Sequence, residues 1–164
     1  MANANVFEPD FDANDDRDGW VRRRAAVGRQ AGAMGLGATL HELPAGGTAY
    51  PHHFHYGNEE LMVVLSGRPT LRTPAGEEEL APGDVVAHLV GPEGAHQVTN
   101  RGSEPVRFLM LSEMEGPEVV VYPDSDKIGA RSEAPGPNRD SELWAVFRAV
   151  DEVDYFTDEE PPKA

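Results

Sequence analysis

Glycine and proline interrupt this chain more often than a helical bundle tolerates. The 164 residues include 17 glycines and 14 prolines, which stand between short apolar segments. Strands of roughly four to eight residues with turn signals about every eight to twelve residues are typical of a sandwich or a small barrel. A chain of 164 residues is long enough for one well-buried core. We therefore expect a single all-β domain.

Strand and turn signals alternate along the middle of the chain. Pro82-Gly83 suits a type II turn, because proline fixes φ at the first central residue and glycine takes positive φ at the second. The run LMVVL at 61–65 is apolar on both faces, which indicates a strand between the barrel interior and a covering layer. The predicted strands cover residues 37–43, 61–65, 70–73, 78–80, 84–89, 96–99, 106–111 and 119–122.

Both ends of the chain are predicted to be peripheral to this barrel. Residues 1–30 form an acidic N-terminal extension, and the barrel itself is expected at 31–122. The part at 123–156 is expected to begin with a long surface excursion at 123–142. An apolar segment at 143–150 then returns as a strand or a short helix. The acidic tail at 157–164 is expected to be disordered.

Charge and composition exclude several kinds of site and partner. Without cysteine the chain has no disulfide and no thiolate ligand, so any metal must be bound by nitrogen and oxygen. A net charge of -15 argues against nucleic acid or an anionic membrane as partner, since both attract cationic surfaces. The acidic N-terminus lacks a secretory signal and no apolar run reaches membrane-spanning length, so we expect a cytoplasmic protein.

The stretch PHHFHYGNEELMVVLSG at 51–67 concentrates potential metal ligands. His53 and His55 are two residues apart, so both side chains face the same side of an extended strand. Glu60 has the wrong parity for that strand, but Gly57-Asn58 is a turn signal that can bring it back opposite the histidine pair. Two imidazoles and a carboxylate suit Fe, Mn, Zn, Ni or Co rather than calcium or magnesium.

A fourth candidate ligand, His96, begins a later strand directly after a glycine-bounded loop. Its side chain can face the same interior as the other three. One divalent transition metal held by three histidines and a glutamate would keep up to two octahedral positions for water, substrate or dioxygen.

The spacing of these residues resembles the motifs of the cupin superfamily. The first motif runs Gly, five residues, His, one residue, His, three or four residues, Glu, six residues, Gly, and is filled by Gly47, His53, His55, Glu60 and Gly67. The second motif is matched more loosely. Its counterparts are Gly83, Pro92, Gly94, His96 and Asn100, and Leu89 stands where a proline is usual. The segment VVVYPDSDK is similar to one in single-domain bacterial cupins. The resemblance implies a double-stranded β-helix, or jelly-roll barrel, with Glu60 rather than Glu59 as the ligand.

Other polar residues are weaker candidates. His41 and His88 each interrupt an apolar strand, where a histidine either packs or faces the cavity. If His88 faces the cavity, it is a candidate general acid or base. Arg72 is a second catalytic candidate, because a cavity arginine can bind a carboxylate or phosphate, although its position favours a solvated arginine. His52 alternates away from His53 and is expected in a loop or on the surface.

The resemblance implies two classes of function. One is a metal-dependent enzyme acting on a small polar molecule by oxygenation, decarboxylation or isomerisation. The alternative is a non-enzymatic barrel that binds a metal or a small carbohydrate-like ligand. A second acid-base group in the cavity would favour the enzyme, whereas a cavity lined only by metal ligands and apolar residues would favour the binder. Exposed sheet edges further predict a homodimer.

Overall fold

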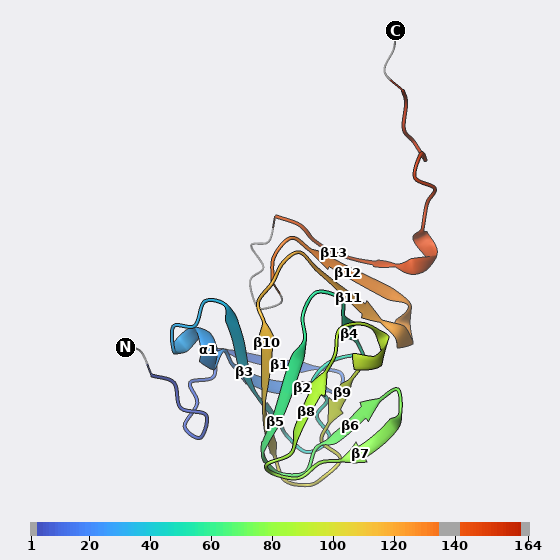
Figure 1. Ribbon diagram of the computed structural model, residues 1–164. Coiled ribbons are helices and arrows are strands. Elements are labelled where there is room, and N and C mark those ends of the chain that lie inside the picture. Colours follow the sequence, from blue (N-terminus) through green and yellow to red (C-terminus); the bar gives the residue numbers. More distant parts are fainter. Residues whose placement is uncertain (1–2, 135–141, 162–164) are drawn as a thin grey trace.

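The computed structural model, which describes residues 3–134 and 142–161, is built from antiparallel sheets (Figure 1). The six-stranded sheet has the order β1 (Ala13–Arg17), β2 (Trp20–Ala25), β3 (Leu36–Leu43), β10 (Val106–Glu113), β5 (Glu60–Ser66) and β8 (Val85–His88). The four-stranded sheet contains β13 (Trp144–Arg148), β12 (Lys127–Arg131), β11 (Glu118–Tyr122) and β4 (Phe54–His55). The three-stranded sheet contains β7 (Gly76–Glu79), β6 (Thr70–Thr73) and β9 (Gln97–Thr99). The prediction of an all-β jelly roll is confirmed.

Short helical segments connect the strands. They are α1 (Val27–Gln30), η1 (Pro92–Gly94), η2 (Pro123–Ser125) and η3 (Ala149–Asp151), the last three being 3₁₀ turns. None of the helices in the described residues is long and apolar enough to cross a membrane.

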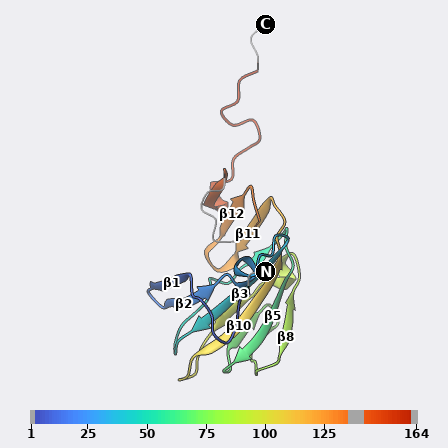
Figure 2. The same ribbon diagram turned by 90° about the vertical axis from the view of Figure 1, so that its left-hand side faces the viewer.

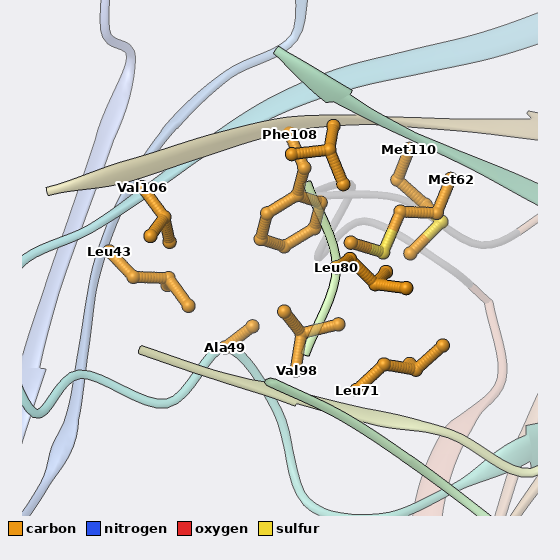
Figure 3. Packing of buried hydrophobic residues seen from close by; sticks show 10 residues of the cluster. Leu43, Ala49, Met62, Leu71, Leu80, Val98, Val106, Phe108 and Met110 are labelled. Carbon is orange, nitrogen blue, oxygen red and sulfur yellow. The ribbon is translucent and has the colours of Figure 1, made fainter. Parts of the chain in front are cut away.

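The main core fills the space between the six-stranded sheet and the three-stranded sheet (Figure 3). On β10 the alternation of buried and partly buried positions points Val106, Phe108 and Met110 inward. Leu71 of β6 and Val98 of β9 face them from the other side. Alternate residues of a strand point to opposite faces, so these apolar positions bury one face of each sheet.

A second apolar cluster covers the outer face of the six-stranded sheet. It is formed by Ala25, Val27 and Leu40, with Leu65 of β5 and Leu109 of β10 packed against it. The prediction that the LMVVL strand lies between the interior and a covering layer is therefore confirmed.

The Pro82-Gly83 turn has the predicted backbone conformation. Gly83 has a φ of 95°, as the second central residue of the Pro82-Gly83 turn requires. Its amide donates a hydrogen bond of 2.9 Å to the carbonyl of Val64, which ties the turn to β5.

The ends of the chain contain more regular structure than the sequence indicates. The hairpin β1–β2 extends the six-stranded sheet beyond β3 (Figure 2). The surface excursion expected at 123–142 is wrong over β12, which pairs with β11 along its whole length. This strand reads KIGAR and has one β-branched residue, so its sequence lacks a strand signal. The part of the excursion at 135–141 lies outside the described residues.

The returning strand expected at 143–150 is confirmed as β13, which pairs with β12. Beyond η3 the chain extends away from the barrel (Figure 1), with residues 152–161 exposed. Disorder of the tail stays a prediction, and its last residues, 162–164, lie outside the described part.

Candidate metal centre

His53 and His96 face each other across an isolated antiparallel bridge. The amide of His53 donates to the carbonyl of His96 at 3.2 Å, and the amide of His96 donates back at 2.9 Å. His55 follows in β4, where it pairs with Val120 of β11. The two-residue spacing keeps the rings of His53 and His55 together, with centroids 5.1 Å apart. Two distant segments thus bring the three histidines together.

Glu60 joins the histidines because the chain reverses at Gly57-Asn58. The buried Asn58 amide donates to the carbonyl of Glu115 at 3.0 Å, and its oxygen accepts from the Glu115 amide at 2.9 Å. Asn58 also donates to the Glu118 carboxylate, which accepts from the amide of Gly57 at 3.1 Å. The turn is therefore clamped to the start of β11, a contact that the sequence does not indicate.

Three potential ligand atoms, one each from His53, Glu60 and His96, lie within 4.8 Å of one another. The Glu60 Oε2 atom is 3.3 Å from His96 Nε2 and 3.6 Å from His55 Nε2. His55 stands beside the group of three rather than within it. All four candidate ligands from the sequence are thus neighbours.

Backbone carbonyls fix the tautomers of two histidines. His53 Nδ1 lies 2.9 Å from the Pro51 carbonyl oxygen, and His96 Nδ1 lies 3.0 Å from that of Gly94. A carbonyl oxygen only accepts, so each Nδ1 carries the hydrogen and each Nε2 presents a lone pair. Such backbone partners orient the histidine ligands of metals.

The four residues fit a divalent transition metal. The Nε2 atom of His96 is buried and has no hydrogen-bond partner, although an unpaired buried polar atom is costly. Imidazole nitrogens with one carboxylate are the donor set that Fe, Mn, Co, Ni or Zn prefers.

The protonation states of His53 and Glu60 suit metal binding. Burial, with the neighbouring His96 and His55, lowers the pKa of His53 to about 3. Burial raises the pKa of Glu60, but the adjacent His96 and His55 outweigh it and bring the pKa down to about 2. Near pH 7 the His53 imidazole is thus neutral and the carboxylate ionised, as ligands must be. At His55, by contrast, burial lowers the pKa but the adjacent Glu118 and Glu60 outweigh it and raise the pKa.

A cavity of about 320 Å³ adjoins the cluster. Within it the Tyr50 hydroxyl lies 2.5 Å from His41 Nε2, and the His41 ring stacks on Phe108. Besides three of the candidate metal ligands, its wall includes Arg22, Arg24, His41, Tyr50, Arg131 and Trp144. The cavity is thus polar and cationic beyond the metal ligands.

Comparison with known protein families identifies the barrel. The family model of the cupin domain matches residues 39–112, which include all four candidate ligands. These residues are a cupin domain. A search of curated proteins found no match.

Solved structures share the fold of this chain. A protein of Acidithiobacillus ferrooxidans, provisionally named a sugar phosphate isomerase, is 27% identical, with a TM-score of 0.73 over 83% of this chain and 81% of its own. A cupin-superfamily protein of Silicibacter pomeroyi, named a sugar phosphate isomerase, is 22% identical, with a TM-score of 0.76 over 91% and 94%. The polyketide cyclase RemF of Streptomyces resistomycificus is 23% identical, with a TM-score of 0.55 over 69% and 79%.

The second motif of this cupin retains its structural residues despite its loose spacing. A Cβ atom on Gly94 would lie 1.7 Å from the Leu89 carbonyl oxygen, so only glycine fits at this position, two residues before His96. The Asn100 amide donates to the carbonyls of Leu43, Pro44 and Glu104 at 2.8–3.1 Å. Asn100 is therefore a turn residue rather than part of the metal centre.

The candidate His88 is buried opposite Glu60 and is not among the described residues that line the cavity. Its ring stacks on that of His96 at a centroid distance of 3.8 Å, and its Nε2 has no hydrogen-bond partner. Burial, with the neighbouring His96, lowers its pKa to about 3. His88 thus packs behind the cluster as a neutral ring.

Arg72 and His52 occupy one site on the outside of the cavity. Arg72 makes two hydrogen bonds of 2.6 and 2.9 Å to the Asp124 carboxylate and does not appear among the described lining residues. His52 lies in a loop, which was one of the two positions expected for it, but its side chain is buried 3.6 Å from Asp124 rather than on the surface. Asp124, in the turn η2, therefore lies beside both side chains.

Sequence reasoning missed the residues that flank the cupin domain in the cavity wall. Arg22 and Arg24 come from β2 and Arg131 comes from β12. The three consecutive arginines of WVRRRA are the one signal that could have pointed to a cationic strand face, because the first and third lie on the same side of a strand.

Proposed function

We propose that the chain is a metal-dependent enzyme that isomerises a small sugar-like hydroxycarbonyl compound. The observation that carries this proposal is the His41–Tyr50 pair, an acid-base pair in the same cavity as the metal-ligand cluster. Likeness to the A. ferrooxidans protein, provisionally named a sugar phosphate isomerase, supports the same reaction class.

We propose that His53, His55, Glu60 and His96 hold one divalent transition metal. When bound, it would supply a Lewis acid beside the cavity, which polarises a substrate carbonyl. The backbone hydrogen bonds that fix the rings of His53 and His96 would orient these two ligands toward it.

The His41–Tyr50 pair would carry the proton of the isomerisation. Burial raises the pKa of Tyr50, so the hydroxyl stays protonated. Burial, with the charges of Arg22 and Arg24, holds the pKa of His41 well below its usual range, so the imidazole is neutral and can accept a proton. Tyr50 can take a proton from one substrate carbon while passing its own to His41 Nε2, and the reverse transfer returns a proton to the neighbouring carbon. The hydroxyl proton of the substrate passes to its carbonyl oxygen in the same rearrangement. The substrate is rearranged with no net gain or loss of protons.

The same pair separates this proposal from a non-enzymatic carbohydrate-binding cupin. A binder needs no acid-base pair in its cavity. His41 and Tyr50 stand between the metal cluster and the arginines of the wall, where a bound molecule would meet them.

The test is proton exchange between solvent and substrate carbon. Protein loaded separately with Fe, Mn, Co, Ni and Zn is incubated in D₂O with aldoses, ketoses and their phosphates, and deuterium at carbon is followed by NMR. We expect exchange with one substrate group, and a loss of about 100-fold or more in His41→Phe with the metal content unchanged. Full metal content without exchange for any compound would favour the binder, and undiminished exchange in His41→Phe would remove the pair from the mechanism.

We also propose that the chain is a homodimer formed through β13. This strand ends the four-stranded sheet, and its exposed side chains include Trp144, Val146 and Phe147. A second copy can pair with this edge about a two-fold axis and cover them. Phe147→Asp should yield a monomer by sedimentation at micromolar concentration, whereas Val85→Asp on β8, an edge strand of the six-stranded sheet, should not. A monomeric wild type, or dissociation by the β8 variant alone, would contradict this interface.

A further inference from the structure

We infer that Arg22, Arg24 and Arg131 form an anion subsite in the cavity, and that the substrate carries a phosphoryl group there. That the bound molecule is a substrate rests on the proposed function. The anion subsite itself can be tested without turnover. It assigns a role to three residues that lie outside the cupin domain at 39–112.

Two of the arginines share one face of β2. Arg22 and Arg24 are two residues apart, so their side chains leave the strand on the same side, and both line the cavity. Two hydrogen bonds fix the guanidinium of Arg22. Its Nε donates to the Asp15 carboxylate at 2.7 Å, and its Nη1 donates to the Ala49 carbonyl. Its guanidinium also lies over the Tyr50 ring, with the carbon 4.2 Å from the centroid. Arg22 is therefore fixed beside the proposed acid-base pair.

Arg24 is less fully bonded than Arg22. Its Nε lies 3.3 Å from the same Asp15 oxygen, yet without hydrogen-bond geometry, and this buried atom has no hydrogen-bond partner. One carboxylate thus serves two guanidinium groups. A bound oxyanion would supply the acceptors that this arrangement lacks.

Arg131 approaches the cavity from a different sheet. It stands on β12, is largely buried, and its guanidinium carbon lies 5.1 Å from the centroid of the Trp144 ring. Guanidinium groups bind phosphate through paired N–H donors in a planar fork, and a ring beside the plane limits its rotation. Arginines from two sheets can hold one phosphoryl group between them.

The described wall of the cavity carries more basic than acidic side chains. Glu60 is the only carboxylate among the described residues that line it, and that charge is assigned to the metal. Asp15, outside the lining, bonds Arg22 at 2.7 Å and lies 3.3 Å from Arg24. The chain has a net charge of -15, so three arginines in one cavity make the local charge opposite in sign to that of the whole chain. The lowered pKa of His41, caused by burial and then by Arg22 and Arg24, shows their potential inside the cavity.

The test is calorimetric titration of inorganic phosphate into metal-free protein, since phosphate can also bind to a metal. We expect binding by wild type, and a weakening of about tenfold or more in Arg24→Gln and in Arg131→Gln, the scale of one lost charge-assisted hydrogen bond. Arg24→Lys should retain part of the affinity. The matched control is Arg101→Gln, an exposed arginine paired with Glu77 at 2.6 Å, which should change affinity less than about twofold.

Each outcome bears on one proposal. Three results would overturn the subsite. They are no phosphate binding by wild type, an equal loss of affinity in the Arg101 control, and tighter binding of acetate than of phosphate. Turnover of sugars without phosphate binding would leave the isomerase standing and remove the subsite. Phosphate binding without proton exchange would keep the subsite and remove the isomerase. Circular dichroism of each variant separates loss of binding from loss of fold.

Discussion

The imidazole ring of His88 stacks on that of His96, with the centroids 3.8 Å apart and the ring planes 17° from parallel. His96 is otherwise oriented by the Gly94 carbonyl, which accepts from its Nδ1. One ligand ring is thus held by a hydrogen bond at its edge and by an aromatic neighbour at its face.

This stacking predicts that His88 acts through its shape rather than its nitrogens. His88→Phe keeps a flat ring behind His96 and should leave metal affinity within about threefold. His88→Ala opens a gap and should weaken metal binding by about tenfold or more, the scale of losing a partner that orients a ligand. Metal titration of both variants checks this, and an equally large loss in both would instead give the His88 nitrogens a direct role.

A second prediction separates the two adjacent glutamates. Glu60 is half-buried within the cluster, whereas Glu59 is exposed. Glu60→Gln removes the one anionic ligand and should weaken binding of Mn, Fe or Zn by at least about 10- to 100-fold. Glu59→Gln should change affinity by no more than about threefold. A greater loss for Glu59→Gln would mean that the register of β5 is off by one residue.

The Asn58 clamp should be needed for stability. Asn58→Asp replaces an amide donor to Glu118 with a second buried carboxylate, so the free energy of unfolding should fall by about 3 kcal/mol or more. Urea denaturation measures the loss. Adding Glu118→Gln to the same chain should recover much of it, because the new amide can donate to the aspartate. No recovery in the double variant would show that the two side chains do not interact as described.

Metal removal should lower thermal stability. A metal at about 100 times its Kd stabilises the folded chain by about 2.7 kcal/mol, or roughly 5–10 °C in Tm for a domain of this size. Calorimetric scans before and after chelation test this, with Glu59→Gln as a control that should respond like wild type. A Tm that does not change on metal loading would argue against binding within the folded barrel.

The cupin domain could be predicted from the sequence because its signals are local. Turns such as Pro82-Gly83 and the two-residue spacing of His53 and His55 need only the geometry of neighbouring residues. Glu60 was placed by the turn at Gly57-Asn58, and the structure brings it to the histidines.

The cavity wall was not predictable in the same way. Arg22 and Arg24 reach the cavity because β2 pairs with β3, and Arg131 reaches it because β12 follows β11, which pairs with the distant strand β4. No local sequence pattern indicates these sheet positions. His41 faces the cavity rather than the covering layer because β3 pairs with β10 in one register, with His41 opposite Phe108. The buried side chain of His52 likewise lies beside Asp124, which is distant in the sequence.

The most direct test of the metal centre is the metal content of the double variant His53→Ala with His55→Ala. Protein purified without chelating resin is loaded with metal, dialysed and analysed by mass spectrometry, and circular dichroism verifies that the barrel is folded. We expect one equivalent of transition metal per chain in wild type and none in the folded double variant. A full equivalent in the double variant would place the metal elsewhere and contradict the site at His53, His55, Glu60 and His96.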